Sequence, residues 1–231
     1  MKELHSKIQS DLPIIVRKTK AQRRKDLWVT YLDGAGKSGA QYASMFSEVN
    51  LISTTCVKEI SELDKQLLST SASTQEVSTI VIVDDFIGTG NTLIGSLNEF
   101  YSKHGDLLTK KGISVYVLVV TATKGGEDKV RQKLSKLDSS SDLLVHNSLE
   151  TKYHAFHQNN KIWEDENELL RAKDLCQSLG VNLNKRKPLG YGEQGLLLVF
   201  PRNCPNNTLP IFHSKGNGNN AWIPLFERSK R

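Results

Sequence analysis

Two adjacent aspartates, Asp84 and Asp85, follow four β-branched apolar residues at positions 80–83. A turn rich in glycine and threonine comes soon after them and consists of Gly88, Thr89, Gly90, Asn91 and Thr92. Glycines let the backbone curl with its amides turned inward, threonines add hydroxyl donors, and the following helix adds its positive amino-terminal end. The turn therefore predicts an anion cup that suits one phosphate group.

The two aspartates predict a different part of the same ligand. They would repel a phosphate, but they accept hydrogen bonds from the vicinal hydroxyls of a sugar, or hold a divalent cation through water. Sugar hydroxyls on one side and a phosphate on the other describe a ribose 5-phosphate. The alternative is a strand that ends in a helix-capping turn, although two acids and five turn residues exceed what capping requires.

Composition sets the class of protein. The chain has 231 residues, 38% hydrophobic and 24% charged, which is typical of a globular domain with a substantial core. Its amino terminus is polar, and no apolar run approaches the roughly 20 residues that span a bilayer. The three cysteines, Cys56, Cys176 and Cys204, are far apart, which argues against a disulfide framework or a zinc site. A cytoplasmic protein without a membrane partner is expected.

The net charge of +6 is concentrated in one segment, because residues 17–25 hold six basic residues and no acidic one. This basic segment would suit a nucleic acid or an acidic protein partner. A solvated face is the alternative, since no aromatic residues are interleaved for base stacking.

Hydrophobic patterning predicts a doubly wound α/β fold. Strands are expected at 27–32, 49–53, 79–84, 113–120 and 142–146, and helices at 57–68, 92–101 (with Gly105 as a stop) and 126–138. These elements imply a mostly parallel five-stranded sheet with helices on both faces.

The expected organisation has three parts: a basic segment (1–26), the α/β core (27–158) and a hood-like C-terminal α+β appendage (159–231). In the appendage we expect a helix that ends at Gly180 and a strand at 196–200. Tyr191, between two glycines, would stack on a base or pack in its turn.

Residues 80–92 resemble the binding motif for phosphoribosyl pyrophosphate (PRPP) of type I phosphoribosyltransferases. The resemblance implies that Asp84 and Asp85 engage the ribose hydroxyls, directly or with Mg²⁺ held through water, and that the turn at 88–92 holds the 5-phosphate. Phe86 and Gly88 depart from the usual pattern, in which a smaller aliphatic residue and a non-glycine are more common.

The resemblance also gives roles to the loop after the first strand. In that family this loop takes the pyrophosphate, and four residues here offer amides and one ammonium: Gly36, Lys37, Ser38 and Gly39. Asp84, Asp85 and Lys37 are then the expected catalytic residues. The interval 54–78 departs from the family, since it has no Lys-His-Gly-type catalytic element.

Most of the chain resembles a bacterial phosphoribosyltransferase-like group encoded in defence or conflict gene clusters, including some retrons. The resemblance implies an anti-phage effector that binds PRPP or a ribose 5-phosphate nucleotide and transfers or cleaves at the anomeric carbon. Expected partners are a nucleic acid or a defence-complex protein at the basic segment, and a second copy of the chain.

Two other functions stay open. One is a regulatory module that binds PRPP or a nucleotide without turnover. The other is a P-loop-like NTPase, with GAGKS (34–38) as Walker A and 80–85 as Walker B. Walker A needs a glycine five positions before Gly36, where Tyr31 stands. A bulky side chain there would block the wrap around a β-phosphate.

Overall fold

The computed structural model describes residues 27–32, 38–68, 77–201, 204–216 and 222–226. The chain divides into two compact units, Met1–Ser148 and Leu149–Arg231. The basic segment 17–25 lies outside the described residues. No helix in the described ranges is long and apolar enough to cross a membrane.

The first unit is built on a sheet of four strands in the order β1-β2-β3-β4. They are β1 (Leu27–Thr30), β2 (Thr79–Ile87), β3 (Ser114–Thr123) and β4 (Asp142–Leu149). β2 pairs in parallel with β1 and with β3, so it is an interior strand. The predicted α/β fold with a parallel sheet is confirmed, but the prediction of five strands is wrong.

The missing strand is the one expected at 49–53, where the chain instead terminates a helix. Helix α2 (Ser38–Val49) ends in a Schellman-type cap, in which the Ile52 amide donates to the Ser47 carbonyl (2.9 Å) and Leu51 has a left-handed φ of 55°. The apolar side chains of Ile52 and Cys56 are buried in the core without a strand to carry them.

In the chain, β2 lies between the helices α3 (Ile60–Leu68) and α4 (Asn91–Lys111). The short helix η1 (Thr54–Cys56) comes between α2 and α3. Helix α4 passes through the expected stop at Gly105 and ends at Gly112, whose φ is 62° and whose amide donates to the last carbonyls. A glycine inside a helix costs only about 1 kcal/mol relative to alanine, which so long a helix tolerates.

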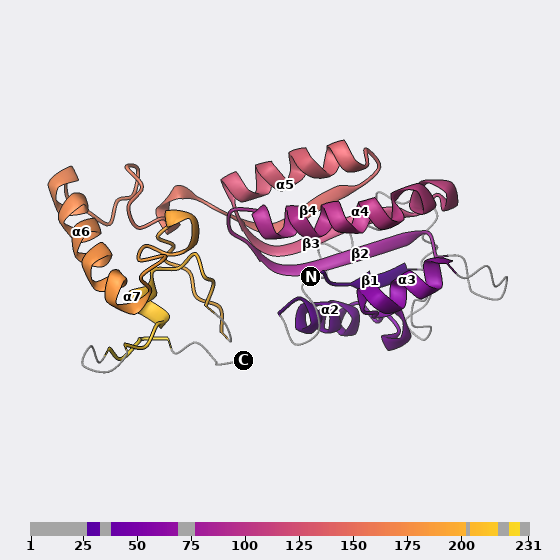
Figure 1. Cartoon of the computed structure of the whole chain (residues 1–231), viewed down its shortest axis with the longest axis horizontal. Coiled ribbons are helices and arrows are strands. Elements are labelled where there is room, and N and C mark those ends of the chain that lie inside the picture. The colour runs from indigo at the N-terminus through magenta and orange to yellow at the C-terminus, as the bar shows by residue number, and fades with distance from the viewer. Residues whose placement is uncertain (1–26, 33–37, 69–76, 202–203, 217–221, 227–231) are drawn as a thin grey trace. The chain divides into compact units, whose positions relative to one another are not determined.

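Helices cover both faces of the sheet, as predicted (Figure 1). One core joins alternate residues of β2 and β3, such as Ile82 and Val117, to α3, α4 and α5 (Lys124–Leu137). The other core joins Val81 and Leu118 to α2 through Phe46. The interior strands are therefore buried on both faces, which explains their nearly continuous apolar sequences.

The second unit has its own backbone connections. It contains η2 (Thr151–Tyr153), α6 (Glu166–Leu183), η3 (Tyr191–Glu193) and α7 (Pro210–His213). The amide of Leu197 donates to Tyr153 (2.8 Å) and that of Ala155 to Gly195 (2.9 Å), so residues that the sequence analysis gave to the core bond within this unit.

Two expected features of this unit are wrong. The strand at 196–200 is reduced to isolated bridges, in which Leu196 pairs with His154 and Thr208. Gly180 does not end α6 but lies inside it, buried, where a Cβ atom would overlap the Pro188 carbonyl. The glycine is needed there for close approach of two segments rather than for a cap.

Candidate functional site

Both aspartates lie in β2, which extends three residues beyond the predicted strand 79–84, and they come directly before its last two residues. Asp84 is opposite Val119 of β3 and is partly buried, and one of its carboxylate oxygens accepts a hydrogen bond from the Asp85 amide (2.8 Å). Asp85 is only 7% exposed. Its carboxylate has no hydrogen-bond or ion-pair partner among the described residues. The Asp85 carboxylate is therefore an acceptor that the described residues leave without a partner, which suits it to receive a ligand.

The turn after β2 presents donors to the same edge of the sheet. Gly90 precedes α4 with a left-handed φ of 78°, and no side chain caps the helix. The first amides of a helix have no partner within it, so those at Asn91 and Thr92 are available to an anion. The hydroxyls of Thr89 and Thr92 make no hydrogen bond to any residue that the structure describes.

The turn rests on the first residues of α5, which the sequence analysis did not include in the site. The Thr123 hydroxyl donates to the Gly88 carbonyl (2.6 Å) and accepts from the Gly126 amide (3.1 Å). A Cβ atom on Gly126 would overlap the Gly88 carbonyl oxygen and lie 2.9 Å from Ile87 Cγ2. Thr123, a preferred type of N-cap residue directly before α5, is the signal that was available in the sequence.

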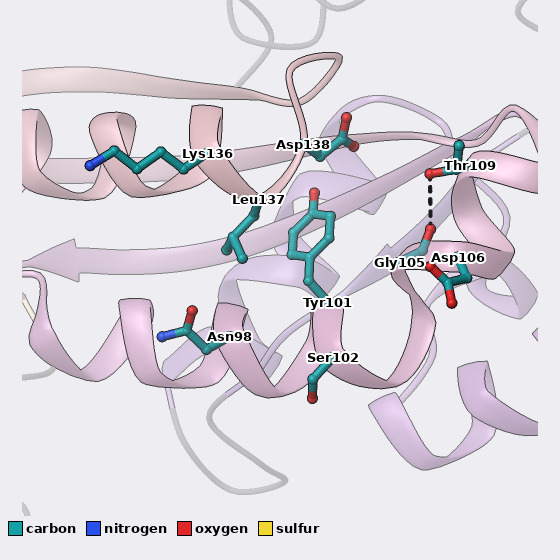
Figure 2. Close-up of a pocket in the computed structure, with 9 residues that line it drawn as sticks. All are labelled: Asn98, Tyr101, Ser102, Gly105, Asp106, Thr109, Lys136, Leu137 and Asp138. Carbon is teal, nitrogen blue, oxygen red and sulfur yellow. Dashed lines mark hydrogen bonds between the residues drawn. The ribbon is translucent and has the colours of Figure 1, made fainter.

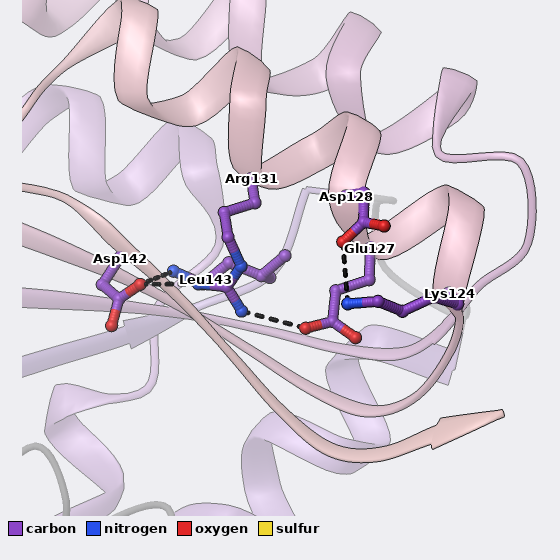
Figure 3. Close-up of polar contacts among 6 residues, drawn as sticks. All are labelled: Lys124, Glu127, Asp128, Arg131, Asp142 and Leu143. Carbon is purple, nitrogen blue, oxygen red and sulfur yellow. Dashed lines mark hydrogen bonds and ion pairs between the residues drawn. The ribbon is translucent and has the colours of Figure 1, made fainter. Parts of the chain in front are cut away.

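Ion pairs hold the helix α5, on which the turn rests, in its position (Figure 3). Arg131 donates to Glu127 (3.0 Å) one turn earlier in α5 and to Asp142 (3.0 Å) at the start of β4, which ties the helix to the sheet. Lys124 donates to Asp128 (2.9 Å), and this hydrogen bond raises the pKa of Lys124. The two acids of α5, Glu127 and Asp128, are therefore each paired with a cation.

One further cation lies at the turn itself. The Lys129 ammonium donates to the side-chain oxygen of Asn91 (2.7 Å), so α5 contributes a positive charge at the first residue of α4. Both side chains are exposed. The sequence alone gave no signal for this contact, because 38 residues separate the two partners.

The other predicted residues are only partly described. Ser38 and Gly39 begin α2 directly after the loop that follows β1. Because β1 and β2 are parallel, the segments that follow them leave from the same edge of the sheet. Gly36 and Lys37 lie outside the described residues, and Tyr191 belongs to the second unit.

A metal ion would rely on the acid pair. In the described ranges no three His, Cys, Asp or Glu side chains are grouped so as to hold a metal. Mg²⁺ commonly binds one or two carboxylates and completes its shell with water and substrate phosphates. Asp84 and Asp85 fit that kind of site, in which the ligand supplies part of the coordination.

A cavity of about 570 Å³ lies elsewhere in the first unit, between α4 and the end of α5 (Figure 2). It contains none of the predicted site residues. Tyr101 lines it and hydrogen-bonds to Ser141 (2.6 Å), and burial raises the pKa of Tyr101.

The contact between Gly126 and the turn gives a test with a matched control. We expect Gly126→Ala to lower the free energy of unfolding by about 1–3 kcal/mol, because the added methyl group overpacks the turn. It should also weaken ribose 5-phosphate binding roughly ten-fold or more, because small displacements misalign the donors. Gly125→Ala has no atom within 4 Å of the new Cβ, so it should leave binding unchanged and should not lower the free energy of unfolding, since alanine favours a helix over glycine by up to about 1 kcal/mol. Urea unfolding and calorimetry measure the two effects, and equal behaviour of the two variants would contradict this account.

Three comparisons place the chain among known proteins. No curated protein matches it. A solved structure of the AQ2163 protein from Aquifex aeolicus is similar at 15% identity and a TM-score of 0.29, over 53% of each chain. Orotate phosphoribosyltransferase from Aeropyrum pernix is similar at 16% identity and a TM-score of 0.29, over 64% of this chain and 74% of that one. The chain thus spans about half the length of the AQ2163 protein. With such low TM-scores, neither similarity bears on the function.

The family model named PRTase-CE, where PRTase abbreviates phosphoribosyltransferase, matches residues 1–228. The match covers nearly the whole chain and includes β2, the turn and both units. The chain therefore belongs to the PRTase-CE family, a phosphoribosyltransferase-like family, as the motif at 80–92 predicted.

Proposed function

We propose that this chain binds PRPP or a ribose 5-phosphate nucleotide at the carboxyl edge of its sheet, and that it transfers or cleaves at the anomeric carbon. The observation that carries the proposal is the carboxylate of Asp85, which belongs to a largely buried residue, has no partner among the described residues and is close in sequence to an uncapped helix start. A ligand with hydroxyls and one phosphate satisfies both features together. Membership of the family favours this interpretation over the P-loop alternative.

The ligand would be held at two points. Its 5-phosphate accepts hydrogen bonds from the amides at Asn91 and Thr92 and from the threonine hydroxyls, with the Lys129 ammonium nearby. Its ribose hydroxyls donate to Asp84 and Asp85. The acids then have partners for their charge, and the phosphate does not meet them directly.

The reaction follows from the charges in that arrangement. The bond from the anomeric carbon to a pyrophosphate oxygen breaks, and pyrophosphate leaves with the electron pair. An acceptor nitrogen or a water oxygen forms the new bond and loses a proton. Positive charge develops on the sugar between these events, and the two carboxylates stabilise it. Mg²⁺ bound to the pyrophosphate would supply charge neutralisation there, and Lys37 is proposed to act at the same leaving group.

A second function has one observation in its favour. The interval between β1 and β2 carries no Lys-His-Gly-type element in its sequence, and its described part forms η1 and α3. A chain without such an element could bind PRPP as a regulatory signal and turn it over slowly or not at all. A role in anti-phage defence is proposed from the resemblance alone, and the neighbouring genes are the first test of it.

The choice of ligand tests the proposal. Because the acids match sugar hydroxyls and the turn matches a single phosphate, PRPP or ribose 5-phosphate should bind more tightly than inorganic triphosphate. Titration calorimetry and shifts in melting temperature measure this preference. Equal shifts with PRPP and triphosphate would mean that the site responds to phosphate charge alone, and the proposal would fail.

Lys129 should contribute to phosphate binding from outside the motif. We expect Lys129→Ala to weaken ribose 5-phosphate binding about five-fold at low salt, because an exposed charge contact is worth up to roughly 1 kcal/mol and is screened by salt. Lys136→Ala removes an equal charge from the other end of α5 and should have little effect. Equal affinities of the two variants for ribose 5-phosphate would mean that Lys129 does not contribute to the site.

Replacing the two acids should mainly affect turnover, whereas replacing the two threonines should mainly affect binding. Asp84→Asn with Asp85→Asn should lower turnover by orders of magnitude, since charge-stabilising groups in dry sites are worth about 3–4 kcal/mol each, while PRPP affinity changes much less. Thr89→Val with Thr92→Val should abolish binding first. Single-turnover kinetics and calorimetry separate these effects. Full activity in the double Asn variant would mean that the acids merely shape the turn.

A further inference from the structure

Three consecutive cations follow the end of α6 in the second unit. Of Lys185, Arg186 and Lys187, the first two are exposed, and neither forms an ion pair with any residue in the described ranges. The last acid of α6 is Asp174, nine residues before the end of the helix, which is roughly 14 Å along its axis and beyond the screening length of about 8 Å. Glu193 is the nearest acid in the sequence, and it is exposed. The local charge is therefore positive.

An aromatic ring lies among these cations. The Lys187 ammonium is 4.1 Å from the centre of the Tyr191 ring, and Tyr191 is partly exposed. The Tyr191 hydroxyl has no hydrogen-bond partner among the described side chains and backbone groups, so the ring rather than the hydroxyl is what this residue contributes.

The loop that carries the ring is held by hydrogen bonds. Asn207 donates its side-chain amide to the Tyr191 carbonyl (3.1 Å) and to the Gln194 side chain (2.8 Å), and the Tyr191 amide donates to Asn206 (2.7 Å). Glu193 is a non-glycine residue with a left-handed φ of 54°, which costs free energy and is found where the surroundings enforce it. The ring is thus positioned in advance of any ligand.

We propose that Lys185, Arg186, Lys187 and Tyr191 form a binding site for single-stranded nucleic acid. The cations contact successive phosphates, and the partly exposed Tyr191 ring stacks on a base. A single strand is required because its bases are accessible to an aromatic side chain, whereas those of a duplex are stacked on one another. None of these four residues belongs to the proposed ribose 5-phosphate site or to the basic segment 17–25.

A purely structural role makes a different prediction. Cations after a helix also stabilise its negative carboxyl end. In that case their removal would lower the melting temperature, and neither nucleic-acid binding nor the identity of residue 191 would depend on them.

The experiment is fluorescence anisotropy of the full chain with a labelled 20-nucleotide oligo-dT over a range of salt concentrations. Lys185→Ala with Arg186→Ala should lower the log–log salt slope by about 1.4, since each phosphate contact with a single strand contributes about 0.7. Lys161→Ala with Lys173→Ala removes two exposed, unpaired cations of the same unit and should leave the slope unchanged. Tyr191→Leu should weaken binding about ten-fold at an unchanged slope, and Tyr191→Phe should bind like the wild type.

Several outcomes would overturn the proposal. They are no salt-dependent binding by the wild-type chain, equal slopes for the two double variants, or equal affinities for Tyr191→Leu and Tyr191→Phe. Loss of the slope in Arg23→Ala with Arg24→Ala and Lys25→Ala, and not in Lys185→Ala with Arg186→Ala, would assign the binding to the basic segment instead. Circular dichroism shows whether each variant is folded, and the double variants change only exposed side chains.

Discussion

The hydrogen bond from Thr123 to the Gly88 carbonyl is the contact on which the candidate site depends. The parallel register of β2 and β3 brings the two segments together, because Ile87 pairs with Ala122 directly before them. Gly126 then allows the backbones to approach more closely than any other residue type would permit. Without this support the backbone of the turn would not be fixed in one conformation, because glycine residues adopt many backbone conformations. The shape of the turn is therefore a property of two strand ends and two helices, not of the motif alone.

The acid pair shows a compromise between stability and binding. Asp85 is only 7% exposed as a residue, and its carboxylate has no partner among the described residues, so the fold places a charged group where it gains little from the protein. The burial of apolar side chains in the same strand, such as Val81 and Val83, stabilises the fold and offsets this cost. A residue selected for stability alone would be apolar or paired at this position. An aspartate at this position fits a ligand that provides the missing partners.

The sequence predicted the interior of the fold better than its edges. Continuous apolar strands, the acid pair and the turn were recognisable because each is a local pattern of residue types. The strand expected at 49–53 failed because Asn50 and Leu51 close α2, and a left-handed leucine has no sequence signature. Thr123, Gly126 and Lys129 were not assigned to the site because they act across 35 or 38 residues of chain, a distance that one sequence without its relatives does not reveal. The stop expected at Gly105 failed because a long helix tolerates an interior glycine, and the end expected at Gly180 failed because that glycine allows close packing inside a helix.

The two proposed sites use positive charge in different ways, and they should therefore respond differently to salt. The first holds one phosphate on backbone amides and hydroxyls beside a partly buried acid pair, where salt screening is weak and geometry decides affinity. The second presents exposed side-chain cations, whose contribution depends on displaced counterions and falls steeply with salt. A mononucleotide offers too few phosphates to gain much from the second site, and a polymer gains little from a cup shaped for one phosphate group. High salt should therefore suppress binding at the second proposed site while the first proposed site remains occupied.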